Sequence, residues 1–473
     1  MRKAEVTAFL SLIFILLITF TGGIIESASI QTAKNYRRAD MNRAMESIFA
    51  EYQKDLLEDY DIFGLEGSYE TGNYSEQLLF DRLSYYGASS MDQSVERIQF
   101  LTDDGAAPFY HQVVTYMQHK FGIDFLSDLV DVAGTWTQQE EKGEEIISNG
   151  KKDQEDLEAG LEKAEAEAKE KEEPVMNLQG VNKDDFKGDS EGENILSQLN
   201  FLTGLPILPL VTPGSFSVSE KSVDLTGAVS HRELNQGYGD FSDQEEGGGD
   251  WFSLLFGQYI LDHFQCATDE GCGAPLDYEL EYLIAGQDSD RANLTRVANR
   301  IVLFRTALNM VYLGKNTVKK NEAKAMAAVI CVPWPVGIPI ATQVLLGVWA
   351  YGEALMDMRA LLKGEKVPVF KNDESWQLSL TSLLKLGTDE DTGDGADFGS
   401  GLPYRDYLRI ILFLTKKEDV AMRALDLIEE DINVGKEQDF FRVDQCVTKL
   451  EVKSKCSFRR GITYTFSTYF GYQ

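Results

Sequence analysis

The feature that most constrains this chain is an uncharged apolar segment close to its N-terminus. Residues 6–25 carry no charged side chain, are rich in Leu, Ile and Phe, and follow Arg2 and Lys3. A helix of this length is about 30 Å long, which matches the hydrocarbon core of a bilayer. The segment therefore predicts one membrane-spanning helix that acts as a signal anchor. Its membrane-anchoring side chains are predicted to be Val6, Phe9, Leu10, Leu12, Ile13, Phe14, Ile15, Leu16, Leu17, Ile18, Phe20, Ile24 and Ile25.

A cleaved secretory signal is the alternative interpretation of this segment. Ser27, Ala28 and Ser29 are small enough to precede a signal-peptidase cut. The apolar core of a signal peptide usually has about 7–15 residues, however, and this one is longer. We therefore expect the helix to be retained.

The apolar pattern continues beyond the predicted anchor. Apolar residues recur in steps of four, three, four and four, at Met41, Met45, Ile48, Tyr52 and Leu56. This spacing keeps them on one helical face. Only Gly22 and Gly23 interrupt the region, which contains no proline. We expect one continuous rod of about 80 Å, with an anchor followed by a separate amphipathic helix as the alternative.

The flanking charges bear on orientation. Arg2 and Lys3 favour a cytoplasmic N-terminus, whereas Lys34, Arg37 and Arg38 argue weakly for the reverse. Large domains translocate largely regardless of such charges. We expect a single-pass protein of the cell membrane whose body is extracellular.

The length and charge of the chain exclude several classes of protein. Its 473 residues suggest two or three folded units, and a hydrophobic content of 43% is sufficient for packed cores. The formal net charge of −32 repels phosphate backbones, so we expect no nucleic-acid partner. The periodicities predict a mainly α protein with smaller β elements (α+β).

We divide the chain into six segments. They are a transmembrane helix with its extracellular extension (1–60), a mixed helical region (61–137), an acidic helical arm, coiled coil or solvated linker (138–174), an irregular, strand-containing segment (175–249), a helical bundle (250–370), and a helix followed by a C-terminal β-hairpin or small sheet (371–473). The apolar stretch 325–351 could be a second span. Its three prolines favour two packed helices joined by a turn.

Four of the five cysteines form two close pairs in the sequence, Cys266 with Cys272 and Cys446 with Cys456. They would be disulfides in an oxidising compartment and unrelated thiols in the cytosol. Their spacing does not match a CxxC metal turn and the four histidines are scattered, so we expect no metal and no cofactor.

Charged residues of the predicted bundle allow two interpretations. Glu281, Arg305, Glu353 and Asp357 fall on helices, where they can form ion pairs or supply a catalytic carboxylate pair. The chain has no Gly-x-Ser-x-Gly elbow, HExxH motif or supported Cys/His arrangement. We therefore predict that the protein is not an enzyme and has no catalytic residues.

Several motifs resemble an uncharacterised family of membrane proteins from Gram-positive bacteria. They are EVTAFLSL at 5–12, IESA at 25–28, SIFAEYQK at 47–54, DYDIFGL at 59–65, YELEYLIAG at 278–286, Asn293-Leu294, Arg305 with Asn309, and WAYGE at 349–353 with Asp357. The N-terminus of that family is similar to the TadE and TadG pseudopilins of tight-adherence (Flp-type) pili.

The resemblance implies an accessory or minor pseudopilin-like component of such a pilus or secretion system. Its partners would be membrane lipid and pilin-like or secretion-system proteins. Glu5 precedes the apolar segment and no glycine stands before it, whereas prepilins carry a glycine before the cleavage site and a glutamate inside the segment. We therefore expect a tether rather than a filament subunit. The alternatives are a surface binding or scaffold protein without a pilus link, and a cell-surface hydrolase.

Overall fold

The computed structural model describes residues 2–120, 127–171, 204–241 except 213 and 215, 250–269, 274–331, 334–391 except 389, and 393–472. The chain forms two units, and neither is a single stretch of sequence. Unit 1 contains residues 1–120, 226–248 and 424–473, and unit 2 contains residues 121–225 and 249–423. The structure is mainly helical with one small sheet, which confirms the predicted fold class.

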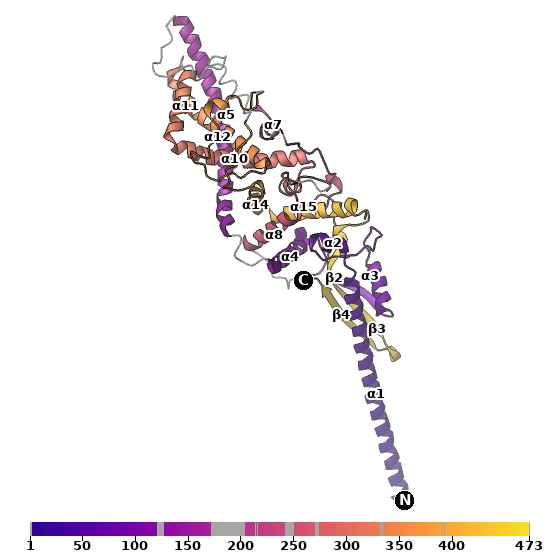
Figure 1. Cartoon of the computed structure of the whole chain (residues 1–473). Coiled ribbons are helices and arrows are strands. Elements are labelled where there is room, and N and C mark those ends of the chain that lie inside the picture. The colour runs from indigo at the N-terminus through magenta and orange to yellow at the C-terminus, as the bar shows by residue number, and fades with distance from the viewer. Residues whose placement is uncertain are drawn as a thin grey trace. The chain divides into compact units, whose positions relative to one another are not determined.

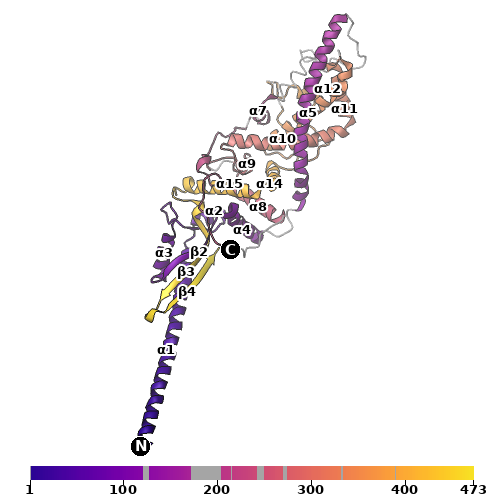
Figure 2. The same cartoon turned by 180° about the vertical axis from the view of Figure 1, so that it is seen from behind.

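Unit 1 combines the long helix α1 (Arg2–Phe49) with a four-stranded antiparallel sheet. The strands are β1 (Leu65–Glu66), β2 (Asp92–Phe100), β3 (Cys446–Ser457) and β4 (Thr463–Gly471). β3 is central, because β2 pairs with one of its sides and β4 and β1 pair along the other. The short helices α2 (Lys54–Tyr60), α3 (Glu76–Leu83) and α4 (Asp103–Lys120) complete the unit. Figures 1 and 2 show the second part of α1 beside this sheet.

The helix α1 runs without a break through Gly22 and Gly23, as the continuous-rod interpretation predicts. It ends at Phe49, so its length is about 72 Å, somewhat less than expected. The chain then turns through an extended Gln53 into α2. Leu56 is buried in α2 and not on the stripe of α1, because that turn changes the direction of the chain.

Unit 2 is a helical bundle around α10 (Asp290–Lys315), which packs against α5, α9 and α12. Its other helices are α5 (Ser127–Lys171), α7 (Ile207–Val211), α8 (Asp250–His263), α9 (Glu279–Ala285), α11 (Thr317–Ile330), α12 (Ile338–Leu362), α13 (Leu380–Leu383) and α14 (Tyr404–Leu414). The helix α15 (Lys417–Glu430) leads the chain from unit 2 into unit 1.

The acidic helix α5 is part of the bundle and differs from the expected arm or linker. The indole of Trp136 stacks on Phe304 of α10 at 3.8 Å between ring centroids, and Glu140 accepts from Arg300 at 2.9 Å. Figure 2 shows α5 crossing α10. The few apolar side chains of α5 are therefore sufficient to bury one side of a helix whose other side is charged.

The apolar stretch 325–351 forms two helices, as its prolines predict. α11 ends at Ile330, a short 3-10 turn spans Pro335–Gly337, and α12 begins at Ile338. α1 and the stretch Pro335–Leu362 are both long and apolar enough to cross a membrane. More than half of the most apolar part of the second stretch is buried inside unit 2, which is typical of a core helix.

The segment predicted to be irregular is only partly described. Residues 216–241 contain a short 3-10 helix at Leu225–Gly227 and isolated bridges, such as Ser222 with Ser289, but no extended strand. Residues 175–203 and 242–249 lie outside the described part of the chain.

Candidate functional site

The first part of α1 exposes every side chain predicted to anchor it. The thirteen residues from Val6 to Ile25 each expose between 37% and 65% of their surface. The hydroxyl groups within this segment donate to carbonyls of the same helix: Ser11 to Ala8, Thr19 to Ile15 and Thr21 to Leu17, at 2.7 to 3.0 Å. Internal satisfaction of polar groups is what a lipid environment requires. This half of α1 presents an apolar surface on every side.

The second part of α1 is buried by its own unit. The side chains that pack on the sheet expose at most 2% of their surface and are Met41, Ala44, Met45, Ile48 and Phe49. They meet the inward face of the sheet, which includes Leu450, Val452 and Phe466. One helix is thus solvent-exposed and apolar at one end and part of a protein core at the other.

Aromatic residues of β4 and the segment after it fix α1 on the sheet. The ring of Phe49 lies 4.7 Å from that of Phe470, and the hydroxyl of Tyr472 donates to the carbonyl of Phe49 at 2.6 Å. Further toward the N-terminus, Arg38 donates to the hydroxyl of Tyr464 at 2.8 Å. These contacts couple the direction of the apolar segment to the orientation of the sheet.

A buried ionic cluster forms the polar centre of unit 2. The guanidinium of Arg305, on α10, donates twice to one carboxylate oxygen of Asp357, on α12, at 2.7 and 2.9 Å. It also donates to the backbone carbonyls of Pro368 and Val369. Both charged side chains are completely buried. The ion-pair interpretation of Arg305 and Asp357 is therefore confirmed.

Lys371 completes this cluster and was not identified from the sequence. Its ammonium lies 2.7 Å from Glu353 and 2.6 Å from the second oxygen of Asp357. Glu353 also accepts the backbone N–H groups of Gln377 and Leu378. Burial raises the pKa of Glu353 above its ordinary value, against the opposing effect of the Lys371 ammonium. Lys371 lies in a segment without periodicity, so no sequence signal marked it.

Glu281 occupies a separate buried position on α9. One of its oxygens accepts from the Tyr404 hydroxyl at 2.7 Å and from the Ala267 N–H at 3.0 Å, and the other has no hydrogen-bond partner. Burial raises the pKa of Glu281 to about 7. A cation partner for Glu281, as the ion-pair interpretation expects, is absent from the described contacts.

The accessibility of these carboxylates decides what chemistry they can perform. Glu281, Glu353 and Asp357 expose none of their surface, so a substrate cannot reach them in this conformation. Their hydrogen bonds hold helices and an irregular segment together. The arrangement favours a structural role over the catalytic pair.

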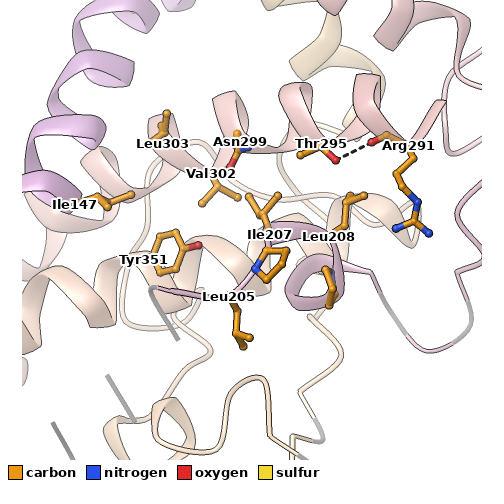
Figure 3. Close-up of a pocket in the computed structure, with 12 residues that line it drawn as sticks. Ile147, Leu205, Ile207, Leu208, Arg291, Thr295, Asn299, Val302, Leu303 and Tyr351 are labelled. Atoms are coloured by element: carbon orange, nitrogen blue, oxygen red, sulfur yellow. Dashed lines mark hydrogen bonds between the residues drawn. The ribbon is translucent and has the colours of Figure 1, made fainter. Parts of the chain in front are cut away.

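A pocket of about 690 Å³ lies within unit 2 (Figure 3). Ile207 and Leu208 of α7 form one wall, and α10 forms another with Thr295 and Val302. The Thr295 hydroxyl donates to the carbonyl of Arg291 on the same helix, so it is already occupied. The lining is mainly apolar, with Arg291 at one end. The pocket fits an apolar ligand better than a charged one.

The two predicted disulfides have different outcomes. Cys446 and Cys456 lie on the single strand β3 and are both free thiols, so the predicted bridge is wrong. Ten residues of extended strand span about 33 Å, whereas bridged cysteines have Cα atoms about 4.4–6.8 Å apart. Cys266 is a buried free thiol, and its predicted partner Cys272 lies outside the described residues.

No cluster of metal-binding side chains occurs among the described residues. Burial raises the pKa of the Cys266 thiol to about 12 and that of Cys446 well above its ordinary value, which disfavours the nucleophilic thiolate form of both. Among the described residues, the apolar half of α1 and the pocket of unit 2 are two features that bear on partner binding.

Comparison with known proteins gives a family whose function is unknown. Residues 186–458 match a family of unknown function (DUF5702). No curated protein and no solved structure matches the chain.

Proposed function

The chain belongs to that family of unknown function, so we propose its role from its structure: it is a membrane-anchored surface protein. The observation that carries this proposal is the change of surroundings along α1. Residues 6–25 are apolar on all sides and exposed, while Met41–Phe49 of the same helix are buried on a sheet. Burying the exposed segment in a bilayer removes its apolar surface from water.

We further propose that the protein is an accessory or minor pseudopilin-like component of a tight-adherence-type pilus or secretion system. The resemblance of its N-terminal motifs supports this assignment, as does a helix that leads directly from an apolar segment onto an antiparallel sheet. The body is extracellular in this proposal, and the protein acts by presenting its folded units to pilin-like partners. It performs no catalysis.

A surface binding protein without a pilus link is the second candidate. The apolar pocket of unit 2 supports it, because a cavity of about 690 Å³ lies in the range of small-molecule sites. A cell-surface hydrolase has less support, since the carboxylates considered for catalysis are fully buried.

Membrane fractionation tests the anchor. The full chain should remain in the membrane pellet after alkaline carbonate extraction. A Leu12→Arg/Leu16→Arg variant should be released, because each arginine at the centre of a spanning helix costs about 2.5–3.5 kcal/mol of insertion free energy. Tyr36→Arg is the control, since Tyr36 is exposed on the same helix but outside the apolar segment. Release of the unmodified chain by carbonate contradicts the proposal.

Two further measurements address topology and partners. Protease added to intact cells should digest the body, and protection of the body indicates the opposite orientation. Cross-linking in native membranes should recover pilin-like subunits with the chain. Normal pilus assembly and adhesion in a deletion strain contradict the pilus role but leave the anchor in place.

A further inference from the structure

The end of unit 1 nearest the apolar segment of α1 is basic, although the whole chain is strongly acidic. The chain has 77 acidic and 45 basic side chains. Residues 27–39 of α1 and residues 452–473 at the C-terminus contain no Asp or Glu. Six basic residues of these two regions form what we call the basic collar: Lys34, Arg37, Arg38, Lys453, Lys455 and Arg459.

The fold brings the two halves of this collar together. The ammonium of Lys34 lies 5.0 Å from the ring centroid of Tyr464, and Arg38 lies 5.8 Å from that of Phe466. Because β4 runs from Tyr464 beside Lys34 toward Phe470 beside Phe49, the turn between β3 and β4 points toward the N-terminal end of α1. Figures 1 and 2 show this hairpin turn beside α1, between the apolar end of the helix and the rest of the sheet.

The basic collar begins just beyond the lipid headgroups if residues 6–25 fill the hydrocarbon core. Lys34 is nine residues beyond Ile25, so it lies about 13 Å farther along the helix. Long basic side chains reach back toward a bilayer surface, and the headgroup layer is about 5–8 Å thick on each side. The Lys34 ammonium is thus within one screening length of lipid phosphates, whereas Arg38 lies about 20 Å along the helix from Ile25 and is the farther part of the collar.

The basic side chains are available to such anions. Arg38, Lys455 and Arg459 are exposed, and Lys34 and Arg37 are half-buried. Among the described ion pairs, Glu96 of β2 holds Lys453 at 3.1 Å, and none involves the other five. Asp92 lies opposite Lys455 in the strand register, and Glu26 and Asp40 flank the stretch of α1 that carries Lys34, Arg37 and Arg38. The collar therefore carries a net positive charge.

We propose that the basic collar binds the phosphate groups of anionic phospholipids where α1 leaves the bilayer. This inference rests on the proposed membrane anchor. A chain of net charge −32 is repelled by an anionic surface, and a local basic contact offsets this repulsion where the sheet faces the membrane. Because the hairpin is packed on α1, the contact also fixes the angle at which unit 1 stands on the membrane.

Hydrogen exchange of the full chain in lipid nanodiscs tests the collar. The chain is placed in discs of phosphatidylcholine alone and in discs that also contain phosphatidylglycerol. We expect several-fold slower exchange in peptides covering residues 455–463 when phosphatidylglycerol is present. The slowing should disappear near 1 M salt, where the Debye length falls to about 3 Å. Equal exchange in both lipids, or slowing that survives high salt, overturns the proposal.

Charge-neutral variants locate the effect. Arg38→Gln/Lys455→Gln/Arg459→Gln should lose the lipid-dependent slowing. Lys54→Gln is the matched control, because Lys54 is an exposed basic residue of the same unit outside the collar. Slowing that persists in the triple variant assigns the contact to other residues and overturns the proposal.

Two additional arms separate the sources of failure. Co-flotation with vesicles of either lipid reports insertion, so a chain that does not float contradicts the proposed anchor and the collar with it. A chain that floats with both lipids but exchanges equally contradicts the collar alone. Inorganic phosphate added to phosphatidylcholine discs should have no effect, and slowing in that arm indicates a free-phosphate site instead of a membrane contact.

Discussion

At the scale of single residues, unit 2 places charge inside its core in two different ways. Around Arg305, two cations and two carboxylates balance each other in a fully buried cluster. At Glu281 the structure instead has one carboxylate with two donors, one empty oxygen and a pKa raised to about 7. In the first cluster each carboxylate has a cationic partner, whereas Glu281 has none among the described contacts and takes up a proton near neutral pH.

Glu281 should make unit 2 less stable as the pH rises. Its folded-state pKa of about 7 lies above its ordinary value of 4.5, so the folded chain binds more protons between these values. The contribution of protonated Glu281 to the stability of unit 2 is complete below pH 4.5 and is lost as the pH rises through 7. Glu281→Gln keeps an acceptor for Tyr404 and should remove this pH dependence. The total change in the free energy of unfolding that it removes is roughly 3 kcal/mol at most.

Urea unfolding of the detergent-solubilised chain between pH 4.5 and 8 measures the effect of Glu281→Gln. Tyr404→Phe is a useful companion, because it removes a donor to the carboxylate and should raise the pKa further. An unchanged pH slope in the Glu281→Gln protein contradicts the assignment.

Lys371 should be essential to the stability of unit 2. Lys371→Met leaves Glu353 and Asp357 facing a single cation in a fully buried site. Loss of one member of a buried ionic network costs about 3–5 kcal/mol in the free energy of unfolding. Lys371→Met/Glu353→Gln restores the charge balance and should recover part of that loss, but the backbone N–H groups that Glu353 accepts limit the recovery. Denaturation of the single and double variants measures the coupling, and additive losses contradict it.

At the scale of elements, α5 shows that a charge-dense sequence can form a packed helix. Its glycines have different surroundings, and Gly143 lies against α10. A Cβ atom at Gly143 would come within 2.0 Å of the carbonyl oxygen of Leu303. Gly150 lies about two turns farther along α5. A Cβ atom at Gly150 would meet nothing within 4 Å. Gly143 is therefore a position at which a side chain would separate α5 from α10.

Substitution at these two glycines should have opposite effects. Gly143→Ala forces the backbones of α5 and α10 apart and should destabilise unit 2 by about 1–3 kcal/mol or more. Gly150→Ala should stabilise it by about 0.5–1 kcal/mol through helix propensity. Thermal unfolding of both variants gives the comparison. Two stabilised variants indicate that α5 is the solvated arm that its composition suggested.

The elements that could be predicted are those with a strong periodicity or a long apolar run. α1, the turn between α11 and α12, and the strands near Val452 and Phe466 all follow from local pattern. Partners that are distant in the sequence could not be predicted, because a pairing such as that of β2 with β3 joins positions that are hundreds of residues apart. The spacing of Cys446 and Cys456 suggested a small closed loop, but both lie on one extended strand, since the hairpin turn follows Cys456.

The buried sites follow the same division. Arg305 and Asp357 could be assigned to a pair because both lie on helices with a regular pattern. Lys371 could not, because its position depends on an irregular segment folding back onto α12. The basic collar likewise requires β4 to lie beside α1. Neither the helical pattern of α1 nor the strand pattern of β4 predicts this contact.

At the scale of the whole molecule, anchoring and folding use separate parts of the same helix. The apolar half of α1 has only solvent around it among the described residues, while the other half needs a sheet whose central strand lies at the far end of the sequence. Unit 2 has its own core, built around α10 and α12. A destabilising substitution in β3 should therefore unfold unit 1 and leave both the membrane insertion of α1 and the fold of unit 2 unchanged.

Leu450→Asp tests this separation. Leu450 is fully buried on β3 under α1, so a carboxylate there is desolvated without a partner and unit 1 should lose its cooperative unfolding. Calorimetry should retain the transition of unit 2, and carbonate extraction should still leave the chain in the membrane. Thr465→Asp, at an exposed position of β4, is the control and should change neither result. Loss of membrane retention in the Leu450→Asp protein indicates that the sheet is needed for anchoring, and a single lost transition for the whole chain indicates that the two units fold together.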